Sequence, residues 1–289
     1  MEFWRAYRQY VVLGMLALVT LGIWAAVFAE ERSGVLTVAV LDVGQGDSIF
    51  IESPTGVQII VDGGPDASLL RELPGVMGSF DRSVDAIIET HPDADHIAGF
   101  VDLLDRYEVG AFLEPGIPKE TLTFEVLQQK VGKHEIPHLL ARRGMRLLIG
   151  GGAELEVLYP DTDVSELSSS KANEGGIVMK LTYGEATMLL MADVSSKIET
   201  YLVGLDGETL DTDLLKVGHH GSRTSTSDAF VKAVTPAAAV ISVGGDNTYG
   251  HPTSDVINTL ISNNVPVLRT DQEGTIVFVS NGGEFVRTK

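Results

Sequence analysis

Four potential metal ligands lie within six residues in the first third of the chain. The run is His91-Pro92-Asp93-Ala94-Asp95-His96, and it directly follows a β-branched segment that predicts a strand at 84–89. Two imidazoles and two carboxylates this close together would repel one another or stay partly unsatisfied unless a cation joined them. The simpler alternative is a helix N-terminus capped by Asp93 or Asp95, with incidental histidines. We favour metal binding because further ligand types follow downstream.

Later predicted strands also end in histidine or aspartate. Asp193 follows the strand predicted at 187–191, His219 and His220 follow the next strand between glycines, and His251 lies beyond a glycine-rich loop. Loops at strand ends are where sites collect in α/β folds. Each residue has a simpler explanation, such as Asp193 acting as a helix cap. Four such loops in one chain favour a shared centre.

Two further sets of residues are ambiguous or unsuitable as ligands. Asp62 begins an Asp-Gly-Gly turn after another predicted strand. Its carboxylate either forms the turn or orients a ligand histidine, and the sequence does not separate these roles. His134 and His138 have helical spacing, but Pro137 between them breaks that geometry, so we interpret them as surface residues.

The composition limits the kinds of site and partner. The chain has 289 residues, of which 44% are hydrophobic, enough for a sizeable core. It contains no cysteine, so disulfides, Cys-ligated zinc and iron–sulfur centres are excluded. The formal charge of −19 argues against broad, non-specific binding of DNA or RNA, which depends on a basic surface. A nucleic acid could still enter a locally neutralised cleft.

The N-terminal segment has the composition of a membrane span. Residues 10–29 carry no charged side chain and form a run of about 20 residues, enough to cross roughly 30 Å of hydrocarbon. Arg5 and Arg8 precede it and Glu30 and Glu31 follow it, which predicts a cytoplasmic N-terminus and an extracytoplasmic body. The alternative is a cleaved signal peptide and a secreted protein. We favour a retained single-pass anchor in the cytoplasmic membrane, because the run is longer than a usual signal core.

The body, residues 35–289, has the pattern of one α/β domain. Residues 1–9 precede the anchor at 10–29, and a polar linker at 30–34 joins the anchor to the body. β-Rich runs open each half, and strands then alternate with helices. The expected strands are 35–43, 48–52, 57–61, 84–89, 155–159, 177–183, 187–191, 214–217, 238–243, 265–268 and 275–279. The expected helices are 94–104, 121–131, 227–234 and 254–262.

Several motifs, in order along nearly the whole body, carry a family resemblance. They are Asp42-Val43-Gly44-Gln45-Gly46-Asp47-Ser48, Asp62-Gly63-Gly64, the run at 91–96, Ala192-Asp193, Lys216-Val217-Gly218-His219-His220-Gly221-Ser222, Tyr249-Gly250-His251-Pro252, Arg269-Thr270-Asp271 and Gly274. The chain resembles metallo-β-lactamase-fold hydrolases, and within them the extracytoplasmic C-terminal hydrolase domain of ComEC-type competence proteins. The resemblance implies an αββα sandwich, here preceded by one transmembrane helix. A single anchor stands in place of the many-helix transport channel of those proteins.

The resemblance also implies a centre for one or two divalent ions. The expected ligands are His91, Asp93, Asp95, His96, Asp193 and His220. His91 and Asp93 would form one position and Asp95 and His96 the other. Asp193 would bridge the two, and one of His219 and His220, which we assign as His220, would complete the second position.

The chain departs from the superfamily pattern at two places. The usual motif is His-x-His-x-Asp-His, and Asp93 stands in place of its second histidine. Most members also have a histidine before the bridging aspartate, where this chain has Asn173-Glu174-Gly175-Gly176. The first position therefore has fewer ligands. A carboxylate in place of an imidazole makes the site harder, which shifts its preference from Zn²⁺ toward Mn²⁺, and either ion is expected.

The predicted activity is that of a phosphodiesterase or nuclease outside the cytoplasmic membrane, acting through a metal-activated water. The expected catalytic residues are Asp95, His219 and His251, the histidines by hydrogen-bonding the phosphate or protonating the leaving oxygen. The expected orienting or substrate-binding residues are Asp47, Asp62, Asn173 and Ser222.

The resemblance suggests extracellular DNA as the substrate. A short single strand is easier to reconcile with 21 basic and 40 acidic residues than a long duplex, and Lys216 and Arg223 are expected to serve as local cations. A separate channel protein is an expected partner, and the oligomeric state is left open. Two alternatives are a hydrolase of an ester, lactone or β-lactam, and a membrane-tethered, non-catalytic metal-binding module.

Overall fold

The computed structural model describes residues 2–29, 34–78 and 80–289. The chain divides into two compact units, Met1–Ser33 and Gly34–Lys289, which we describe separately. The predicted linker falls largely on residues 30–33, which lie outside the described residues.

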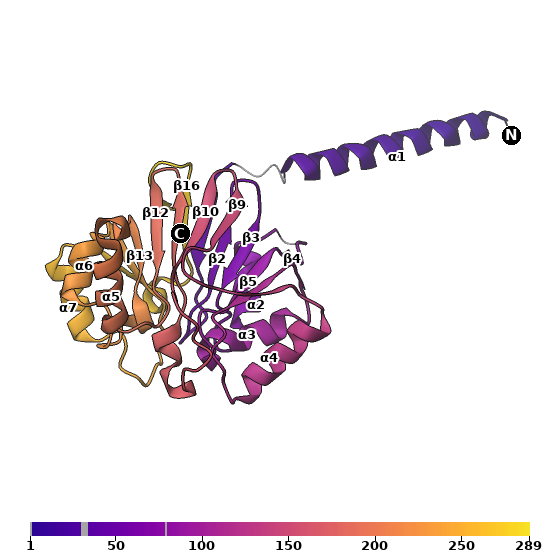
Figure 1. Cartoon of the computed structure of the whole chain (residues 1–289). Coiled ribbons are helices and arrows are strands. Elements are labelled where there is room, and N and C mark those ends of the chain that lie inside the picture. The colour runs from indigo at the N-terminus through magenta and orange to yellow at the C-terminus, as the bar shows by residue number, and fades with distance from the viewer. Residues whose placement is uncertain (1, 30–33, 79) are drawn as a thin grey trace. The chain divides into compact units, whose positions relative to one another are not determined.

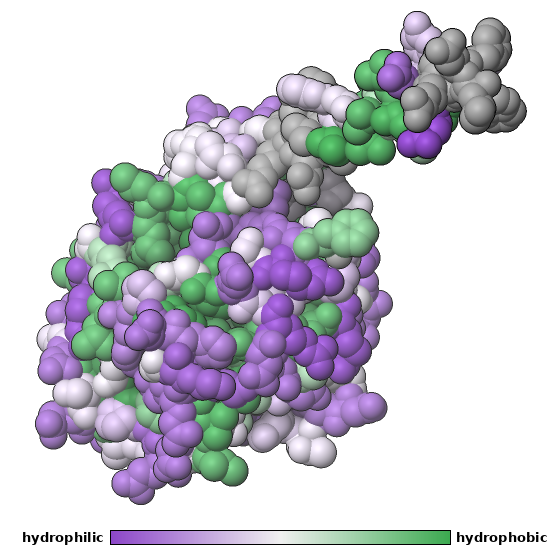
Figure 2. Space-filling view, turned by 90° about the vertical axis from the view of Figure 1, so that its right-hand side faces the viewer, coloured by the Kyte–Doolittle hydropathy of each residue, from purple (hydrophilic) through white to green (hydrophobic). Residues whose placement is uncertain are grey.

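The first unit contains one helix, α1 (Glu2–Ala29). Its segment Tyr7–Trp24 has a mean hydropathy of 1.3 and none of it is buried, so by length and composition this helix could cross a membrane. In Figure 2 the described part of α1 is mainly hydrophobic, whereas the face of the body in view is mainly hydrophilic. The helix includes most of the residues predicted as a separate N-terminal segment, 1–9, because no glycine or proline interrupts residues 2–9.

The second unit is a sandwich of two β-sheets with helices on both outer faces (Figure 1). The first sheet has eight strands in the order β17-β16-β1-β2-β3-β5-β7-β8. They are β1 (Leu36–Val40), β2 (Ile49–Glu52), β3 (Gln58–Val61), β5 (Ala86–Ile88), β7 (Phe112–Glu114), β8 (His138–Leu140), β16 (Ile276–Ser280) and β17 (Val286–Arg287).

The second sheet has seven strands in the order β15-β14-β13-β12-β11-β10-β9. They are β9 (Arg146–Gly150), β10 (Ala153–Tyr159), β11 (Val178–Tyr183), β12 (Ala186–Leu190), β13 (Leu214–Lys216), β14 (Ala238–Ile241) and β15 (Val267–Arg269). A small parallel pair is formed by β4 (Ser83–Val84) and β6 (Glu108–Val109).

The outer layers are helical, as Figure 1 shows for α2, α3 and α4 on one side and α5, α6 and α7 on the other. The α-helices of the body are α2 (Ser68–Glu72), α3 (Ala94–Leu103), α4 (Leu122–Lys133), α5 (Ser196–Asp206), α6 (Asp228–Val234), α7 (Ser254–Ser262) and α8 (Thr270–Glu273). Short 3₁₀ segments are Leu73–Gly75, Ser169–Gly175, Gly207–Leu210 and Gly218–Gly221.

Three apolar layers hold the four structural layers together. Successive residues of a strand point to opposite faces. In β5, Ile87 packs with Phe100 and Leu127 of the helices, while its neighbour Ile88 packs between the sheets. A third cluster, which includes Phe230, joins the second sheet to α5, α6 and α7. Because both faces are covered, the strands read as continuous apolar runs.

Parallel pairing brings the ends of six strands to a common region. β3, β5 and β7 pair in parallel in the first sheet, and β12, β13 and β14 do so in the second. Asp62 follows β3, His91 closely follows β5, Asp193 closely follows β12, and the His219–His220 pair closely follows β13. The fold therefore delivers the predicted ligands to one place.

Candidate metal centre

One carboxylate oxygen lies among four imidazoles. The Nε2 atoms of His91, His96, His219 and His220 lie 3.9, 3.5, 3.6 and 3.5 Å from Oδ2 of Asp193. These separations exceed those of ordinary N–H···O hydrogen bonds, about 2.7–3.2 Å. They suit atoms that share an ion, because metal–nitrogen and metal–oxygen bonds of about 2.0–2.2 Å place neighbouring ligands roughly this far apart.

Several of these atoms have no hydrogen-bond partner. Nε2 of His91, His96 and His220 and Oδ1 of Asp193 are buried and unpartnered among the described residues. Leaving a buried polar atom unsatisfied costs about 1–3 kcal/mol, so such a concentration in one place calls for a ligand. The donors are nitrogen and carboxylate oxygen, which suit Zn²⁺ and Mn²⁺. The residues therefore fit a divalent metal.

The ligand loops adopt backbone conformations that are uncommon for residues with a side chain. Ala192, His219 and His220 have φ angles of 46°, 50° and 52°, and Asp62 has 60°. Such conformations cost about 1–3 kcal/mol each and persist where the surrounding structure imposes them, often at functional sites. Here they turn the chain sharply at strand ends, so that His219 and His220 face Asp193 and Asp62 faces His96.

His96 is oriented by a buried carboxylate. Oδ2 of Asp62 lies 2.8 Å from Nδ1 of His96, and Asp62 also accepts hydrogen bonds from the backbone N and Oγ1 of Thr90 at 2.8 and 2.7 Å. An ionised carboxylate only accepts, so Nδ1 of His96 carries the proton and Nε2 presents its lone pair to the centre. Of the two roles open for Asp62, these contacts are those of an orienting partner.

His220 is oriented by groups on its far side. Its Nδ1 lies 3.1 Å from the carbonyl oxygen of Ser242 and 3.3 Å from Oδ1 of Asp47. Asp47 is paired in turn with Lys216, whose Nζ lies 2.7 Å from Oδ2. Lys216 is only 1% exposed, so the expectation that it serves as a local cation for substrate is wrong. Its charge is neutralised by Asp47 inside the protein.

The carboxylates make the centre a strongly negative environment. Burial alone would lower the pKa of His220, but Asp193, Asp47 and Asp95 outweigh it and raise that pKa to about 10. For Asp95 the effects have the opposite signs: burial alone would raise its pKa, but His220 and His96 lower it to about 2. The same histidines hold the pKa of Asp193 well below its usual range despite its burial. The site thus favours cations.

The family follows from comparison with known proteins. A sequence profile described as "Metallo-beta-lactamase superfamily" matches residues 41–245, more than half of the chain. The chain belongs to the metallo-β-lactamase superfamily. The predicted family and αββα fold are confirmed, and the chain is classed with the superfamily's metal-dependent hydrolases.

Two relatives match most of the chain at 30% identity. The chain is 30% identical to ComE operon protein 3 of Bacillus subtilis (strain 168) over 263 residues, covering 83% of this chain and 32% of that protein. It is also 30% identical to Competence protein ComA of Neisseria gonorrhoeae over 247 residues, covering 85% of this chain and 33% of the relative. The chain thus spans about a third of the length of these relatives.

Solved structures share the fold at low sequence identity. YhfI from Bacillus subtilis, a metallo-β-lactamase fold protein, has a TM-score of 0.56 at 14% identity, over 85% of this chain and 100% of that chain. CmlA, a diiron β-hydroxylase from Streptomyces venezuelae, has a TM-score of 0.53 at 15% identity, over 81% of this chain and 52% of that chain. These likenesses concern the fold alone.

Asp93 differs from the other predicted ligands of the superfamily motif. Oδ2 of Asp93 lies 3.9 Å from Nε2 of His91, but Oδ1 lies 2.6 Å from Nζ of Lys119. Asp93 occupies the N-cap position of α3 without a capping hydrogen bond from its side chain. Two of the tight ligand groups contain predicted metal-binding residues only: His91 with His96 and Asp193, and Asp95 with His96 and His220. Two others include Asp47, one with Asp62 and His96 and one with Asp193 and His220. Asp93 belongs to none of them.

The predicted catalytic and substrate-binding residues lie at differing distances from the centre. His251 is partly exposed, and its ring centroid lies 5.6 Å from that of His219. Ser222 Oγ lies 3.0 Å from Oγ1 of Thr224, which lies 3.3 Å from Nδ1 of His219. Asn173 is in the 3₁₀ segment Ser169–Gly175, and its side chain makes no hydrogen bond to the centre among the described residues.

Some contributors could not be singled out from the sequence. Thr90 and the Ser242 carbonyl act through common hydrogen-bonding groups that carry no motif. Lys119 follows β7, the parallel neighbour of β5, and the only signal was its position just beyond a strand end. That signal is weak, because lysine in a loop is most often a solvated surface residue.

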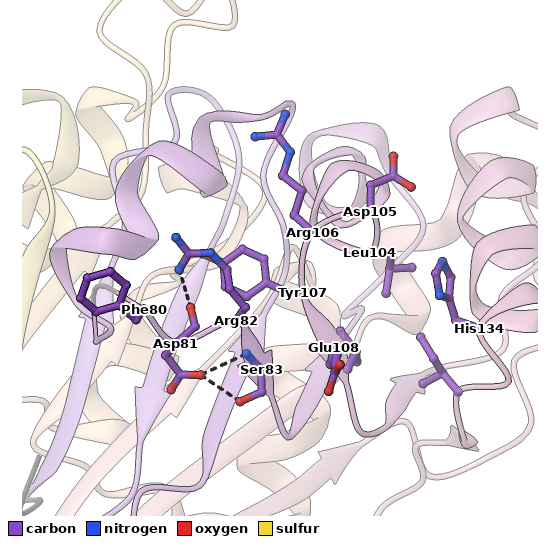
Figure 3. Close-up of a pocket in the computed structure, with 12 residues that line it drawn as sticks. Phe80, Asp81, Arg82, Ser83, Leu104, Asp105, Arg106, Tyr107, Glu108 and His134 are labelled. Carbon is purple, nitrogen blue, oxygen red and sulfur yellow. Dashed lines mark hydrogen bonds between the residues drawn. The ribbon is translucent and has the colours of Figure 1, made fainter. Parts of the chain in front are cut away.

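A separate hollow of about 630 Å³ contains none of the predicted site residues (Figure 3). It lies beyond the C-terminal end of α3, whereas Asp95 and His96 are in the first turn of that helix. In it Arg82 lies over the ring of Tyr107, 5.4 Å from the centroid, and Asp81 accepts hydrogen bonds from Ser83. The ligand chemistry of the chain is therefore concentrated at the opposite end of α3.

Proposed function

We propose that this chain is a metal-dependent phosphodiesterase, anchored in the cytoplasmic membrane by α1, whose body acts on DNA outside the cell. The observation that carries the proposal is the ring of four imidazole nitrogens, 3.5–3.9 Å from one oxygen of Asp193, with further carboxylates at its edge. A carboxylate shared by several imidazoles is the arrangement expected for two neighbouring divalent ions.

The metal would be held by His91, His96, His220, Asp193 and Asp95, with Asp93 at the edge. When bound, divalent ions lower the pKa of a water molecule toward neutrality and stabilise negative charge on a phosphoryl group. A centre rich in carboxylates favours Mn²⁺ relative to an all-histidine site, which suits phosphoryl oxygen as a substrate ligand.

His219 and His251 supply the hydrogen bonds for the substrate. The side chain of His219 is 30% exposed, whereas His220 beside it is buried, so His219 can reach a phosphate at the mouth of the centre. Burial and the neighbouring His219 lower the pKa of His251, so its ring is neutral near pH 7. A neutral imidazole can donate a hydrogen bond to the phosphate from its N–H. Ser222 supports His219 through Thr224.

The identity of the relatives supports DNA as the substrate class. One of them is named Competence protein ComA, and the name of another, Recombination protein 2 of Haemophilus influenzae, points to DNA. Arg223 is exposed beside Ser222 and is available to a phosphate, whereas Lys216 is buried. With so few free cations at the centre, a single strand fits better than a long duplex. A separate channel protein is the partner this role would require.

Cleavage of bis(p-nitrophenyl) phosphate by the full-length chain in detergent tests the proposal. Mn²⁺, Zn²⁺ and EDTA are compared. We expect metal-dependent cleavage that EDTA and Asp95→Ala abolish, and then faster cleavage of single-stranded than of duplex DNA. Binding of metal without cleavage of any phosphodiester would contradict the proposal and favour an acyl substrate or a non-catalytic module.

His251→Ala separates substrate contact from metal binding. The variant should retain its metal and lose about 10²–10⁴-fold in kcat, the usual contribution of a proton-transfer group. Unchanged kcat would remove His251 from the mechanism.

A further inference from the structure

Lys119 links Asp93, one departure from the superfamily motif, to the 3₁₀ segment in which the other departure begins. Asp93 stands where a second histidine is usual, and residues 173–176 lack the usual histidine before Asp193. Nζ of Lys119 lies 2.6 Å from Oδ1 of Asp93 and 3.1 Å from the carbonyl oxygen of Ser169, which begins the 3₁₀ segment leading to Gly175. One ammonium group therefore contacts Asp93 and the first residue of the 3₁₀ segment that contains Asn173.

The ion pair between Lys119 and Asp93 is partly sheltered from water. The side chain of Lys119 is 16% exposed and that of Asp93 is 30% exposed, so solvent screens the pair less than it would on an open surface. A hydrogen bond of this length between charged groups is strong and directional. It occupies Oδ1 of Asp93 and leaves Oδ2, which faces Nε2 of His91 at 3.9 Å.

The charge of Lys119 affects a divalent ion on this side of the centre. An ion held by His91 and Oδ2 of Asp93 would lie one carboxylate away from the ammonium group. Like charges at that separation repel, and the interaction is appreciable at the dielectric of a partly buried site. Lys119 also neutralises the charge with which Asp93 would attract the ion.

On the opposite side of Asp193, no lysine or arginine of the described residues pairs with a carboxylate that faces the centre. Asp95 lies 3.5 Å from Nε2 of His220 and keeps both its oxygens free of ion pairs with lysine or arginine among the described residues. Lys216 is near, but it lies behind His220 and is paired with Asp47.

We propose that Lys119 is a positioning residue that makes the two metal positions unequal. It places a fixed positive charge beside His91 and Asp93, so that this position binds a divalent ion more weakly than the position formed by Asp95, His96 and His220. The inference rests on the metal-dependent function proposed above. In this chain a lysine thus pairs with the carboxylate that stands in place of the second histidine of the superfamily motif.

Calorimetric titration of the metal-free full-length chain with Mn²⁺ tests the proposal. We expect one tight and one weak binding event. In Lys119→Met, which keeps the length of the side chain and removes its charge, the weak event should tighten by about tenfold or more, within the range that groups next to metal ligands produce. The tight event should stay within about threefold. At two equivalents of Mn²⁺, electron paramagnetic resonance should show more spin-coupled ion pairs in the variant.

Two further variants separate charge from other effects. Lys119→Arg keeps the charge and should keep the two affinities unequal. Lys232→Met removes an exposed lysine that pairs with Asp228, away from the centre, and should change neither affinity. Two equal affinities in the unsubstituted chain, or a weak event that Lys119→Met leaves unchanged or weakens, would overturn the role of Lys119. A chain that binds no divalent ion at all would instead overturn the proposed metal-dependent function.

Discussion

The two sides of Asp193 are built differently. On one side, the His220 side, the imidazole is buried and supported from behind by Ser242, Asp47 and Lys216. On the other, the His91 side, Asp93 is partly exposed and directly paired with Lys119. A lysine thus appears on each side, but one supports a ligand through a carboxylate and the other binds a carboxylate that faces the centre. The position of a charge relative to the ligand decides whether it helps or hinders a second cation.

The largest effect is expected where both sides meet. Asp193→Asn removes the carboxylate charge around which His91, His96, His219 and His220 lie. Metal should be lost from both positions, and phosphodiester cleavage should fall to background. The measurements are metal content after dialysis and turnover of bis(p-nitrophenyl) phosphate. Asp246→Asn makes the same change on an exposed nearby loop and should bind metal normally. Retention of one tight ion in Asp193→Asn would show that the two sides are independent.

The same substitution on the two sides should differ in its effect on stability. Asp47→Asn leaves the buried ammonium of Lys216 without its partner, which costs about 3–5 kcal/mol of the free energy of unfolding. Asp93→Asn breaks the partly exposed pair with Lys119 and should cost about 1 kcal/mol or less. Urea denaturation of the metal-free chain compares the two. Equal losses would mean that the two lysines are in equivalent environments.

The pH dependence of the metal-free chain tests the negative environment of the centre, in which the pKa values of both His220 and His96 are raised. The surrounding carboxylates raise the pKa of His220 from 6.5 to about 10 in the folded chain. Because the folded chain binds this proton more tightly than the unfolded chain does, protonated His220 stabilises the fold. The contribution is complete below pH 6.5 and is lost as the pH rises through about 10. Between pH 7 and 9 the free energy of unfolding should therefore fall, by at most about 1.4 kcal/mol per pH unit for this proton.

Thermal unfolding in EDTA at several pH values measures this dependence. His220→Asn removes one titrating ring and should make the profile shallower, while His96, whose pKa is also raised, keeps part of the slope. Loading with Mn²⁺ should flatten the profile, because the ion replaces the protons on these rings. A flat profile in the metal-free, unsubstituted chain would contradict the negative environment described for the centre.

The sequence was sufficient for the parts of the centre that follow local rules. The expected strands and helices lie within a few residues of the observed ones, because apolar runs and turn residues mark them directly. Their ends carry the predicted ligands. Missed elements such as α2 and α5 are short or weakly patterned and depend on packing against the sheets.

The two lysines could not be predicted, for different physical reasons. Lys119 contacts Asp93 and Ser169, which are 26 and 50 residues away in the chain, from a loop without a motif. The sequence predicted that Lys216 lies near the centre, but it did not predict that its side chain is buried. β13 is covered on both faces and all three of its residues are buried, so there is no alternation from which to read the direction of a side chain.

A change that acts on both sides equally would sharpen the contrast with Lys119. His96 belongs to ligand groups on both sides of Asp193, and Asp62 orients it. In Asp62→Asn the amide turns a donor toward Nδ1 of His96, which favours the tautomer with the proton on Nε2, facing the centre. The affinities of both positions for Mn²⁺ should then fall together, by about 10–100-fold. Calorimetric titration measures both in one experiment.

The matched control for this variant is Asp213, directly before β13. It accepts hydrogen bonds from the backbone N and Oγ1 of Thr187, as Asp62 does from Thr90, but among the described residues it makes no hydrogen bond to a histidine of the centre. Asp213→Asn should therefore leave both affinities unchanged, while costing a similar number of hydrogen bonds. If Asp62→Asn weakens metal binding at only one position, His96 serves a single ion, and the two metal positions do not share this ligand. If both weaken together while Lys119→Met alters only one, the inequality of the two positions comes from the charge beside Asp93 rather than from the ligands they share.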